Sequence, residues 1–216
     1  MLIFNKTKDK LSLASREKKL EHFYSLFKEG ESVLDVGIST SFEQEQPGLN
    51  YFLKNYRYAP ETYMGLGVED LSGMEGLYPG KRFVEYSGGK FPFPDKQFDW
   101  VFSNAVIEHV GDNKAQLLFL NEMMRVASNV FFTTPNKYFP VDSHTDVFFL
   151  HWHDELFYRW REKNQRWPGK YAVYLFSFSR LQNLLKNSNA ISFSIYKNRL
   201  IGVSMTFTVI CTDSGA

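Results

Sequence analysis

The chain has 216 residues, 44% hydrophobic and 23% charged, and this composition excludes a disordered or fibrous protein. Its 25 Lys and Arg residues balance 24 Asp and Glu residues, so the formal net charge of +1 argues against a nucleic-acid partner. The single cysteine excludes an internal disulfide, and no apolar run reaches the roughly 18 residues of a membrane span. We expect one cytoplasmic domain over residues 1–216 with a small-molecule partner.

The first predicted helix covers residues 12–29. Leu20, Phe23 and Phe27 recur at helical spacing, and Gly30 stands where a left-handed cap would end the helix. A short apolar run at 32–36 follows and ends in an acid, a valine and Gly37, which is typical of a buried strand that enters a tight turn.

Further strands and helices alternate along the chain. A helix is predicted between the fourth and fifth strands, with Leu117, Leu120, Met124 and Ala127 on one face and Asp112 as its N-cap. A short helix follows Ser179. The predicted strands are 62–67, 82–86, 98–103 and 129–134, and then 191–196 and 201–210 as an antiparallel pair that turns at 197–200.

This alternation predicts an α/β fold with a mostly parallel sheet that is covered by helices on both faces. Ligands of such sheets bind at the carboxyl ends of the strands. Two stretches, 39–60 and 135–170, are predicted as long loops, and loops of this length in a compact domain are usually functional.

The turn after the first strand is the first candidate for binding chemistry. The run Val33-Leu34-Asp35-Val36-Gly37-Ile38-Ser39 places a glycine where a ligand can approach backbone amides closely. It resembles the first motif of the class I S-adenosylmethionine-dependent methyltransferases, which reads hydrophobic-hydrophobic-acid-x-G-x-G-x-G. Ser39 and Ser41 occupy the second and third glycine positions. The resemblance implies that Asp35, Gly37, Ile38 and Ser39 border the cofactor.

An acid ends the second strand, in Gly67-Val68-Glu69-Asp70. In the family this acid accepts hydrogen bonds from the ribose hydroxyls, and a carboxylate can take both hydroxyls at once. The resemblance favours Glu69, with Asp70 as the second choice. On the alternative interpretation either acid simply caps the following turn.

A third run, F-P-F-P-D-x-x-F-D-x-V-x-S-x-x-V-I-E-H-V over residues 91–110, is closely similar to the branch known as type 11 methyltransferases. Where the family usually has an acid that contacts adenine, this chain has Ser87. The resemblance therefore implies adenine contacts from Ser87 and the Gly88 amide, and places Asn104 at the methionine end of the cofactor. It predicts a Rossmann-like class I methyltransferase fold with seven strands.

Two histidines are candidates for a general base, because histidine has the unperturbed pKa nearest neutrality. His109 follows the fourth strand. His144 follows a T-P-N segment that borders the acceptor pocket in the resembling branch, and we prefer it. Three histidines, His144, His151 and His153, stand near Asp142, Asp146 and Asp154 and offer possible metal ligands. A metal site is nevertheless not predicted, because the histidines lack the spacing of ligands on a helix and no cysteine assists them.

The sequence therefore predicts transfer of a methyl group from S-adenosylmethionine to a small-molecule acceptor, which leaves S-adenosylhomocysteine. An oxygen of a saccharide, a phenol or a lipid-like metabolite is the favoured acceptor, and residues 135–170 would cover it. The alternative is a catalytically inactive protein that binds the cofactor or a partner through a degenerate glycine loop. A nicotinamide dehydrogenase and a P-loop enzyme are disfavoured because neither glycine motif is present.

Overall fold

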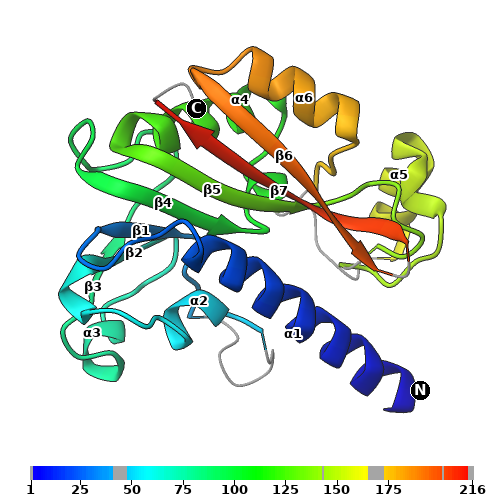
Figure 1. Cartoon of the computed structure of the whole chain (residues 1–216). Coiled ribbons are helices and arrows are strands. Elements are labelled where there is room, and N and C mark those ends of the chain that lie inside the picture. The colour runs from blue at the N-terminus through cyan, green and yellow to red at the C-terminus, as the bar shows by residue number, and fades with distance from the viewer. Residues whose placement is uncertain (1, 41–47, 143, 165–172, 201, 214–216) are drawn as a thin grey trace. The chain divides into compact units, whose positions relative to one another are not determined.

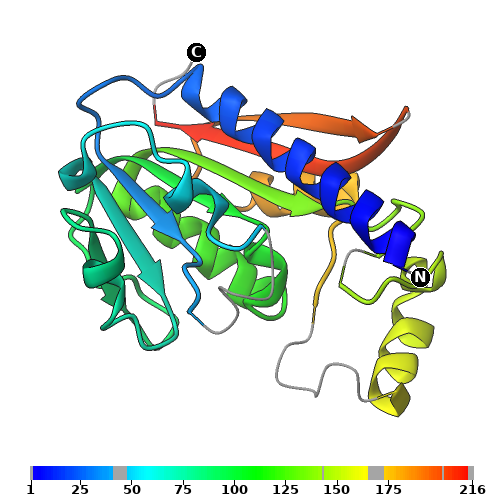
Figure 2. The same ribbon diagram turned by 90° about the horizontal axis from the view of Figure 1, so that it is seen from below.

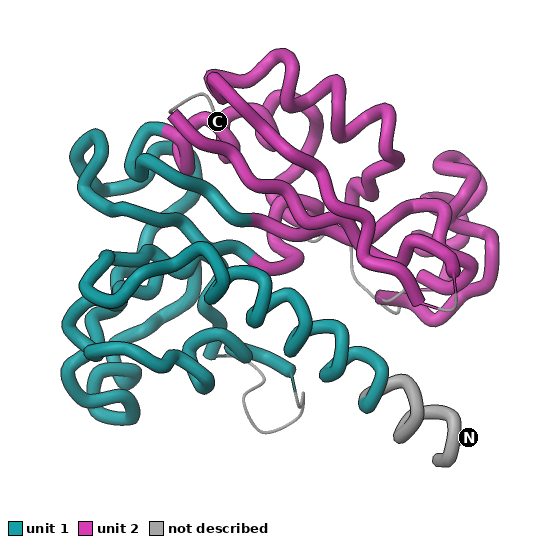
Figure 3. Tube along the Cα trace, in the orientation of Figure 1, with its two compact units in different colours: residues 1–103, 125–131 teal, residues 104–124, 132–216 magenta. Residues whose placement is uncertain are grey.

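The computed structural model describes residues 2–40, 48–142, 144–164, 173–200 and 202–213, with side chains from Lys10 onward. The chain divides into two compact units (Figure 3). Unit 1 comprises Met1–Ser103 and Arg125–Phe131, and unit 2 comprises Asn104–Met124 and Phe132–Ala216. The expectation of a single domain over 1–216 stays a prediction.

Seven strands of the described residues form one sheet in the order β3-β2-β1-β4-β5-β7-β6 (Figure 1). In unit 1, β1 pairs in parallel with β2 and β4, and β2 pairs in parallel with β3, whereas β6 and β7 are antiparallel. This confirms the predicted α/β fold with a mostly parallel sheet and a closing antiparallel pair. The strands are β1 (Val33–Val36), β2 (Tyr63–Gly67), β3 (Arg82–Glu85), β4 (Phe98–Asn104), β5 (Ala127–Pro135), β6 (Ser192–Leu200) and β7 (Val203–Thr212).

The core of unit 1 is built from aromatic rings. Phe23, on helix α1 (Leu2–Tyr24), has its ring centroid 5.1 Å from that of Phe102 and 5.2 Å from that of Phe52, which lies on the short helix α2 (Tyr51–Lys54). Phe102 stacks on Phe131 at 5.6 Å. These buried rings fasten α1 to the parallel strands, because aromatic side chains bury more apolar area than any others. Unit 1 also contains η1 (Pro60–Thr62) and α3 (Met74–Leu77).

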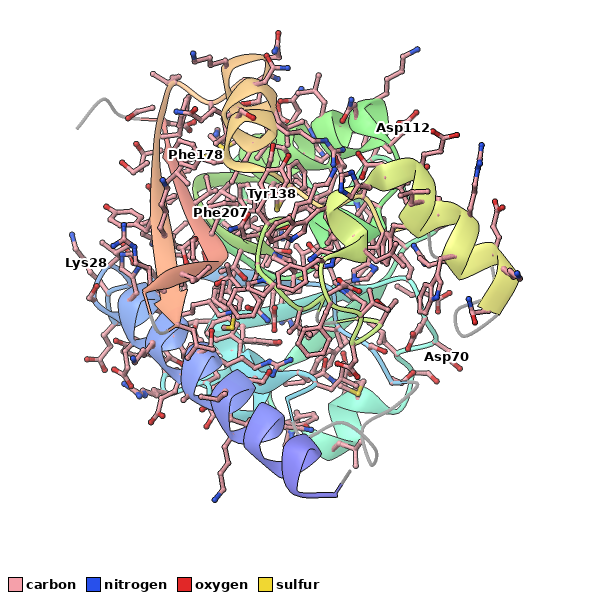
Figure 4. The ribbon with its side chains drawn as sticks, turned by 90° about the vertical axis from the view of Figure 1, so that its right-hand side faces the viewer. Lys28, Asp70, Asp112, Tyr138, Phe178 and Phe207 are labelled. Carbon is pink, nitrogen blue, oxygen red and sulfur yellow. The ribbon has the colours of Figure 1, made fainter. Side chains whose placement is uncertain are left out.

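Two of the helices of unit 2 begin at a capping side chain. Asp112 accepts hydrogen bonds from the amides of Lys114 and Ala115, both at 3.0 Å, so it caps α4 (Asn113–Val126) as predicted. In Figure 4, Phe178 of α6 (Phe178–Lys186) lies beside Phe207 of β7, with ring centroids 5.9 Å apart. The remaining helices are η2 (Ile107–His109), η3 (Leu150–Trp152) and α5 (Asp154–Asn164). No helix of the described residues is long and apolar enough to cross a membrane.

The first helix differs from its prediction at both ends. It begins at Leu2, because residues 2–11 contain no glycine or proline that would interrupt it. It ends at Tyr24, where the Leu26 amide bonds to the Phe23 carbonyl and tightens the last turn. Gly30 is therefore not its cap; it takes φ +87° in the turn before β1. Figure 2 shows α1 as one continuous coil that leads through this turn into β1.

Several other boundaries also differ. Ala127 begins β5 rather than lying on α4. Helix α6 begins at Phe178 rather than after Ser179, and Ser177 caps it by accepting a hydrogen bond from the Arg180 amide at 3.2 Å. Residues 197–200 belong to β6 because the alternation of exposed and covered side chains continues through them. The turn contains Gly202, at φ +81°. The first predicted loop contains α2, and the second contains η3 and α5, because helices this short give only a weak pattern within a polar stretch. Residues 41–47, which include Ser41, and residues 165–172 lie outside the described residues.

Candidate cofactor site and acid–histidine cluster

In unit 1 the chain makes a close turn at the carboxyl ends of β1 and β2. The amides of Gly37 and Ile38 donate hydrogen bonds to the Leu66 carbonyl at 2.9 and 3.1 Å, and Gly37 takes φ +108°. A Cβ at Gly67 would lie 2.3 Å from the Ile38 carbonyl oxygen. Only glycine fits there, so the predicted glycine turn is packed directly against the end of β2.

This turn brings Ser39 to Glu69. The Ser39 hydroxyl donates to Glu69 Oε2 at 2.9 Å, and the Thr40 amide donates to the same oxygen at 2.7 Å. The residue that replaces the family's second glycine therefore binds the acid expected to hold the ribose. Sequence comparison could not reveal this contact, because the two residues lie on different strand ends and meet only when β1 pairs with β2.

The other predicted cofactor residues of unit 1 lie near strand ends. Asp70 Oδ1 accepts a hydrogen bond from the Ser72 amide at 2.9 Å, which lowers the Asp70 pKa and agrees with the turn-capping interpretation; Figure 4 labels this exposed side chain. Ser87 and Gly88 follow β3 and are exposed. Gly88 takes φ +89° and has open space where a Cβ would stand. A ligand can therefore approach the backbone here closely.

Asp35 occupies an interior position in β1. Its carboxylate accepts a 2.5 Å hydrogen bond from the Tyr63 hydroxyl, and both side chains are buried. Burial raises the Asp35 pKa to about 7, while the Tyr63 hydrogen bond and the charge of Lys81 oppose the rise. Lys81 Nζ lies 5.2 Å from the centre of the Tyr63 ring. We did not single out Tyr63 or Lys81 from the sequence; their link to Asp35 depends on strand register, in which Val33 faces Tyr63.

Unit 2 begins with Asn104 at the end of β4. Its Oδ1 accepts a hydrogen bond from the Thr133 hydroxyl at 2.8 Å. The next residue, Ala105, takes φ +59°, a left-handed conformation that is uncommon for a residue with a side chain and is found often at functional sites.

The structure brings both candidate bases into one acid–histidine cluster, which we define as Glu108, His109, Asp142 and His144. The His144 Nδ1 lies 3.2 Å from Asp142 Oδ1, and its Nε2 lies 4.0 Å from Glu108 Oε1. The rings of His109 and His144 meet edge to face, with centroids 4.9 Å apart. Sequence reasoning named the two histidines as alternative bases and considered Asp142 only as a metal ligand. It did not pair Glu108 or Asp142 with a base, although they stand one and two residues from His109 and His144.

Hydroxyl groups hold the two carboxylates of this cluster in place. Asp142 Oδ2 accepts hydrogen bonds from the Thr145 amide at 2.9 Å and from the Thr145 hydroxyl at 2.6 Å. Glu108 Oε2 accepts one from the Thr134 hydroxyl at 3.1 Å. Glu108 is fully buried and Asp142 nearly so, whereas His109 and His144 are partly exposed.

The environment moves the pKa values of the two histidines in opposite directions. Burial, with the nearby His144 and Arg161, lowers the pKa of His109 to about 4. Burial also disfavours charge on His144, but the hydrogen bond and negative charge of Asp142 outweigh it and raise the His144 pKa. Burial alone would raise the Asp142 pKa, yet its bonds to His144 and Thr145 hold it at about 2. Titratable pairs whose pKa values are driven apart are typical of acid–base sites.

The other two histidines of this segment do not join the cluster. His151 is buried, and its Nε2 lies 2.8 Å from the Phe139 carbonyl oxygen, while His153 is exposed at the start of α5. Neither is therefore grouped with His144 as a possible metal ligand among the described residues. The group of described residues that could hold a metal ion is instead Glu108, His109 and His144.

A glycine turn after β1, an acid after β2 and a predominantly parallel seven-stranded sheet are features of a Rossmann-like fold. Comparison with solved structures identifies it more narrowly as the class I methyltransferase fold. A methyltransferase from Methanosarcina mazei superposes with a TM-score of 0.58 at 17% identity, over 88% of this chain and 95% of that one. A possible histamine N-methyltransferase from Thermotoga maritima gives 0.56 at 15% identity, over 98% and 97%. One from Aquifex aeolicus gives 0.51 at 18%, over 90% and 87%.

The sequence itself matches the family model described as a methyltransferase domain over residues 50–129. Residues 50–129 therefore match a methyltransferase domain, and the fold is that of the class I S-adenosylmethionine-dependent methyltransferases, in agreement with the predicted resemblance. The matched segment contains Glu69, Asn104, Glu108 and His109, and it excludes the turn at Gly37 and the segment that carries His144. A search of curated proteins gave no match.

Proposed function

We propose that the protein catalyses methyl transfer from S-adenosylmethionine to a small-molecule acceptor. The observation that carries this proposal is the hydroxyl bound to Glu69 at the end of β2, inside the segment that matches the methyltransferase domain. A ribose hydroxyl is the same kind of donor as the Ser39 hydroxyl, so the carboxylate is already oriented for the contact that the cofactor needs.

The other residues that we assign to the cofactor lie on the strands or just after their ends. Glu69 holds the ribose, with Asp70 as the second candidate, and Ser39 releases Glu69 when the ribose binds. The turn at Gly37 and Ile38 lets the cofactor approach the backbone. The exposed Ser87 and the Gly88 amide receive the adenine. We assign Asn104 to the methionine end, and Asp35 to the support of the turn from inside β1.

The acid–histidine cluster supplies the acid–base chemistry. When bound, S-adenosylmethionine offers its sulfonium methyl group to an attacking acceptor atom, and S-adenosylhomocysteine leaves. An acceptor hydroxyl must lose a proton as it attacks, and we assign His144 Nε2 to take it because Asp142 fixes the opposite ring nitrogen. His109, held neutral by burial, is the second candidate.

We further propose that residues 135–170 border the acceptor, which is an oxygen of a saccharide, a phenol or a lipid-like metabolite. Exposed aromatic side chains support this: Tyr138, Phe148 and Phe149 are each about half exposed. Tyr138 is labelled in Figure 4, and its ring centroid lies 6.0 Å from that of Trp152. Aromatic rings in such a position stack on sugar or phenol rings.

A cofactor-binding protein without turnover is the second candidate, because Ser39 competes with the ribose for Glu69. Isothermal titration with S-adenosylmethionine and S-adenosylhomocysteine tests the shared step. We expect binding in the wild type and a loss of binding in Glu69→Gln. Asp70→Asn tests the second candidate and should keep the binding. Formation of S-adenosylhomocysteine with a panel of hydroxyl acceptors then separates the enzyme from the inactive protein. Absence of binding in the wild type would contradict both.

A further inference from the structure

We propose that Glu108, His109 and His144 form a binding site for a divalent first-row transition-metal cation such as Zn²⁺. Each residue offers one ligand atom, and these atoms lie within 4.8 Å of one another. All three belong to unit 2, where η2 carries Glu108 and His109, and His144 approaches them from the segment after β5. The expectation of no metal site rested on the histidines and aspartates of residues 142–154, a set that shares only His144 with this one.

The donor set selects the class of metal. Two imidazoles and one carboxylate are the ligands of zinc sites that keep a fourth position open, and of other open divalent transition-metal sites. Calcium and magnesium prefer sites made of oxygen ligands alone. The imidazole pair therefore favours a transition metal over the alkaline-earth ions.

A second sphere of hydrogen bonds orients the ligands. His144 meets Asp142 through Nδ1 at 3.2 Å, so the other ring nitrogen, Nε2, faces Glu108. A histidine that binds a metal through one nitrogen commonly bonds to a carboxylate through the other, which fixes the ring and raises its basicity. Thr145 in turn holds Asp142, and Thr134 holds Glu108. Hydrogen bonds therefore orient these ligands in the way that second-sphere partners orient the ligands of known metal sites.

Charge and distance are both compatible with a cation. Glu108 and Asp142 carry two negative charges, and Arg161, whose charge acts on both histidines, carries one positive charge. The surplus negative charge favours a dication. Ligand atoms about 2.1 Å from zinc lie about 3.4 Å apart in a tetrahedral site. The group must therefore close by at most about 1.4 Å, which side-chain rotation can supply.

The inference goes beyond the proposed methyl transfer, because metal binding can be measured without cofactor or acceptor. A bound ion would occupy His144 Nε2, the atom otherwise assigned to the acceptor proton. The open fourth position would then receive the acceptor hydroxyl and lower its pKa. A metal and a free base are therefore mutually exclusive occupants of this nitrogen.

The test is titration of untagged, chelator-treated protein with ZnCl₂, followed by isothermal calorimetry near neutral pH. We expect one ion per chain in the wild type, no stoichiometric binding in His109→Gln or Glu108→Gln, and an affinity about 10–100-fold weaker in Asp142→Asn. The exposed His153→Gln is the matched control and should bind as the wild type does. No stoichiometric binding by the wild type, or equal binding by all variants, would overturn the proposal.

A spectroscopic measurement on the wild type covers the case in which buried substitutions prevent folding. Electron spin echo spectra of Cu²⁺-loaded protein should show coupling to nitrogens of two imidazoles. Coupling to one imidazole or to none would overturn the assignment of His109 and His144. Titration of the same metal-free sample with S-adenosylmethionine tests the proposed function separately, because the predicted cofactor residues lie outside this ligand set.

Discussion

Burial of Asp35 predicts that the stability of the fold falls as pH rises. Its pKa is raised from 3.8 to about 7 because burial penalises the carboxylate more than the Tyr63 hydrogen bond and Lys81 favour it. A raised folded-state pKa means that the folded protein binds the Asp35 proton more tightly than the unfolded chain does. This contribution is fully present below pH 3.8 and is lost as pH rises through about 7.

The substitution that isolates this effect is Asp35→Asn, which keeps the shape of the side chain and cannot ionise. The rise of the Asp35 pKa from 3.8 to about 7 corresponds to at most about 4 kcal/mol of unfolding free energy, at about 1.36 kcal/mol per pH unit. We therefore expect Asp35→Asn to gain up to about 4 kcal/mol of unfolding free energy relative to the wild type between about pH 4 and pH 8.

Urea unfolding of the wild type and the variant across this pH range measures the difference. Tyr63→Phe is the companion variant: it removes the hydrogen bond that favours the Asp35 carboxylate, so the loss of stability should be larger and extend to higher pH. A stability difference between Asp35→Asn and the wild type that does not change with pH would refute the reasoning, because Asp35 would then titrate alike in both states.

Three further outcomes follow from the site. Ser39→Gly frees Glu69 from one hydrogen bond and should tighten S-adenosylmethionine binding by about three- to tenfold in a calorimetric titration; unchanged affinity would show that Ser39 does not compete with the ribose. Gly67→Ala forces a Cβ against the Ile38 carbonyl and should cost about 1–3 kcal/mol in chemical unfolding, so wild-type stability would contradict the close turn. His144→Gln should slow methyl transfer about 10²–10⁴-fold and leave cofactor affinity unchanged, and equal loss of both would indicate a structural role instead.

Elements that depend on local patterns were predictable. The apolar run of β1, the helical stripe of α4 and its Asp112 cap are each encoded within a few residues, and all three are observed. The predicted ends of α1 and the predicted role of Gly30 as its cap were wrong. Both the tightened turn at Tyr24 and the later glycine turn can end a helix, and the local sequence does not decide between them. Helix α5 was missed because its polar sequence gives only a weak apolar stripe.

The residues of the candidate site also divide into those that the local sequence identifies and those whose contacts depend on tertiary structure. Glu69, His109 and His144 could be named from the sequence. Glu69 matches the acid that follows the second strand in the resembling family, and histidine has the unperturbed pKa nearest neutrality. Their partners could not be named: the contact of Glu69 with Ser39 exists only because β1 and β2 pair in parallel and the turn at Gly37 packs against Gly67. The pairing of Asp35 with Tyr63 depends on the same register.

By itself, the sequence determined the fold class and the residue types of the site, because the hydrophobic period and the order of the residues are properties of the chain. Tertiary structure alone decided that Glu108 and His109, which follow β4, meet His144 and Asp142, which follow β5. Segments distant in sequence come together only through packing, and the burial that results is what drives the pKa values of the two histidines apart.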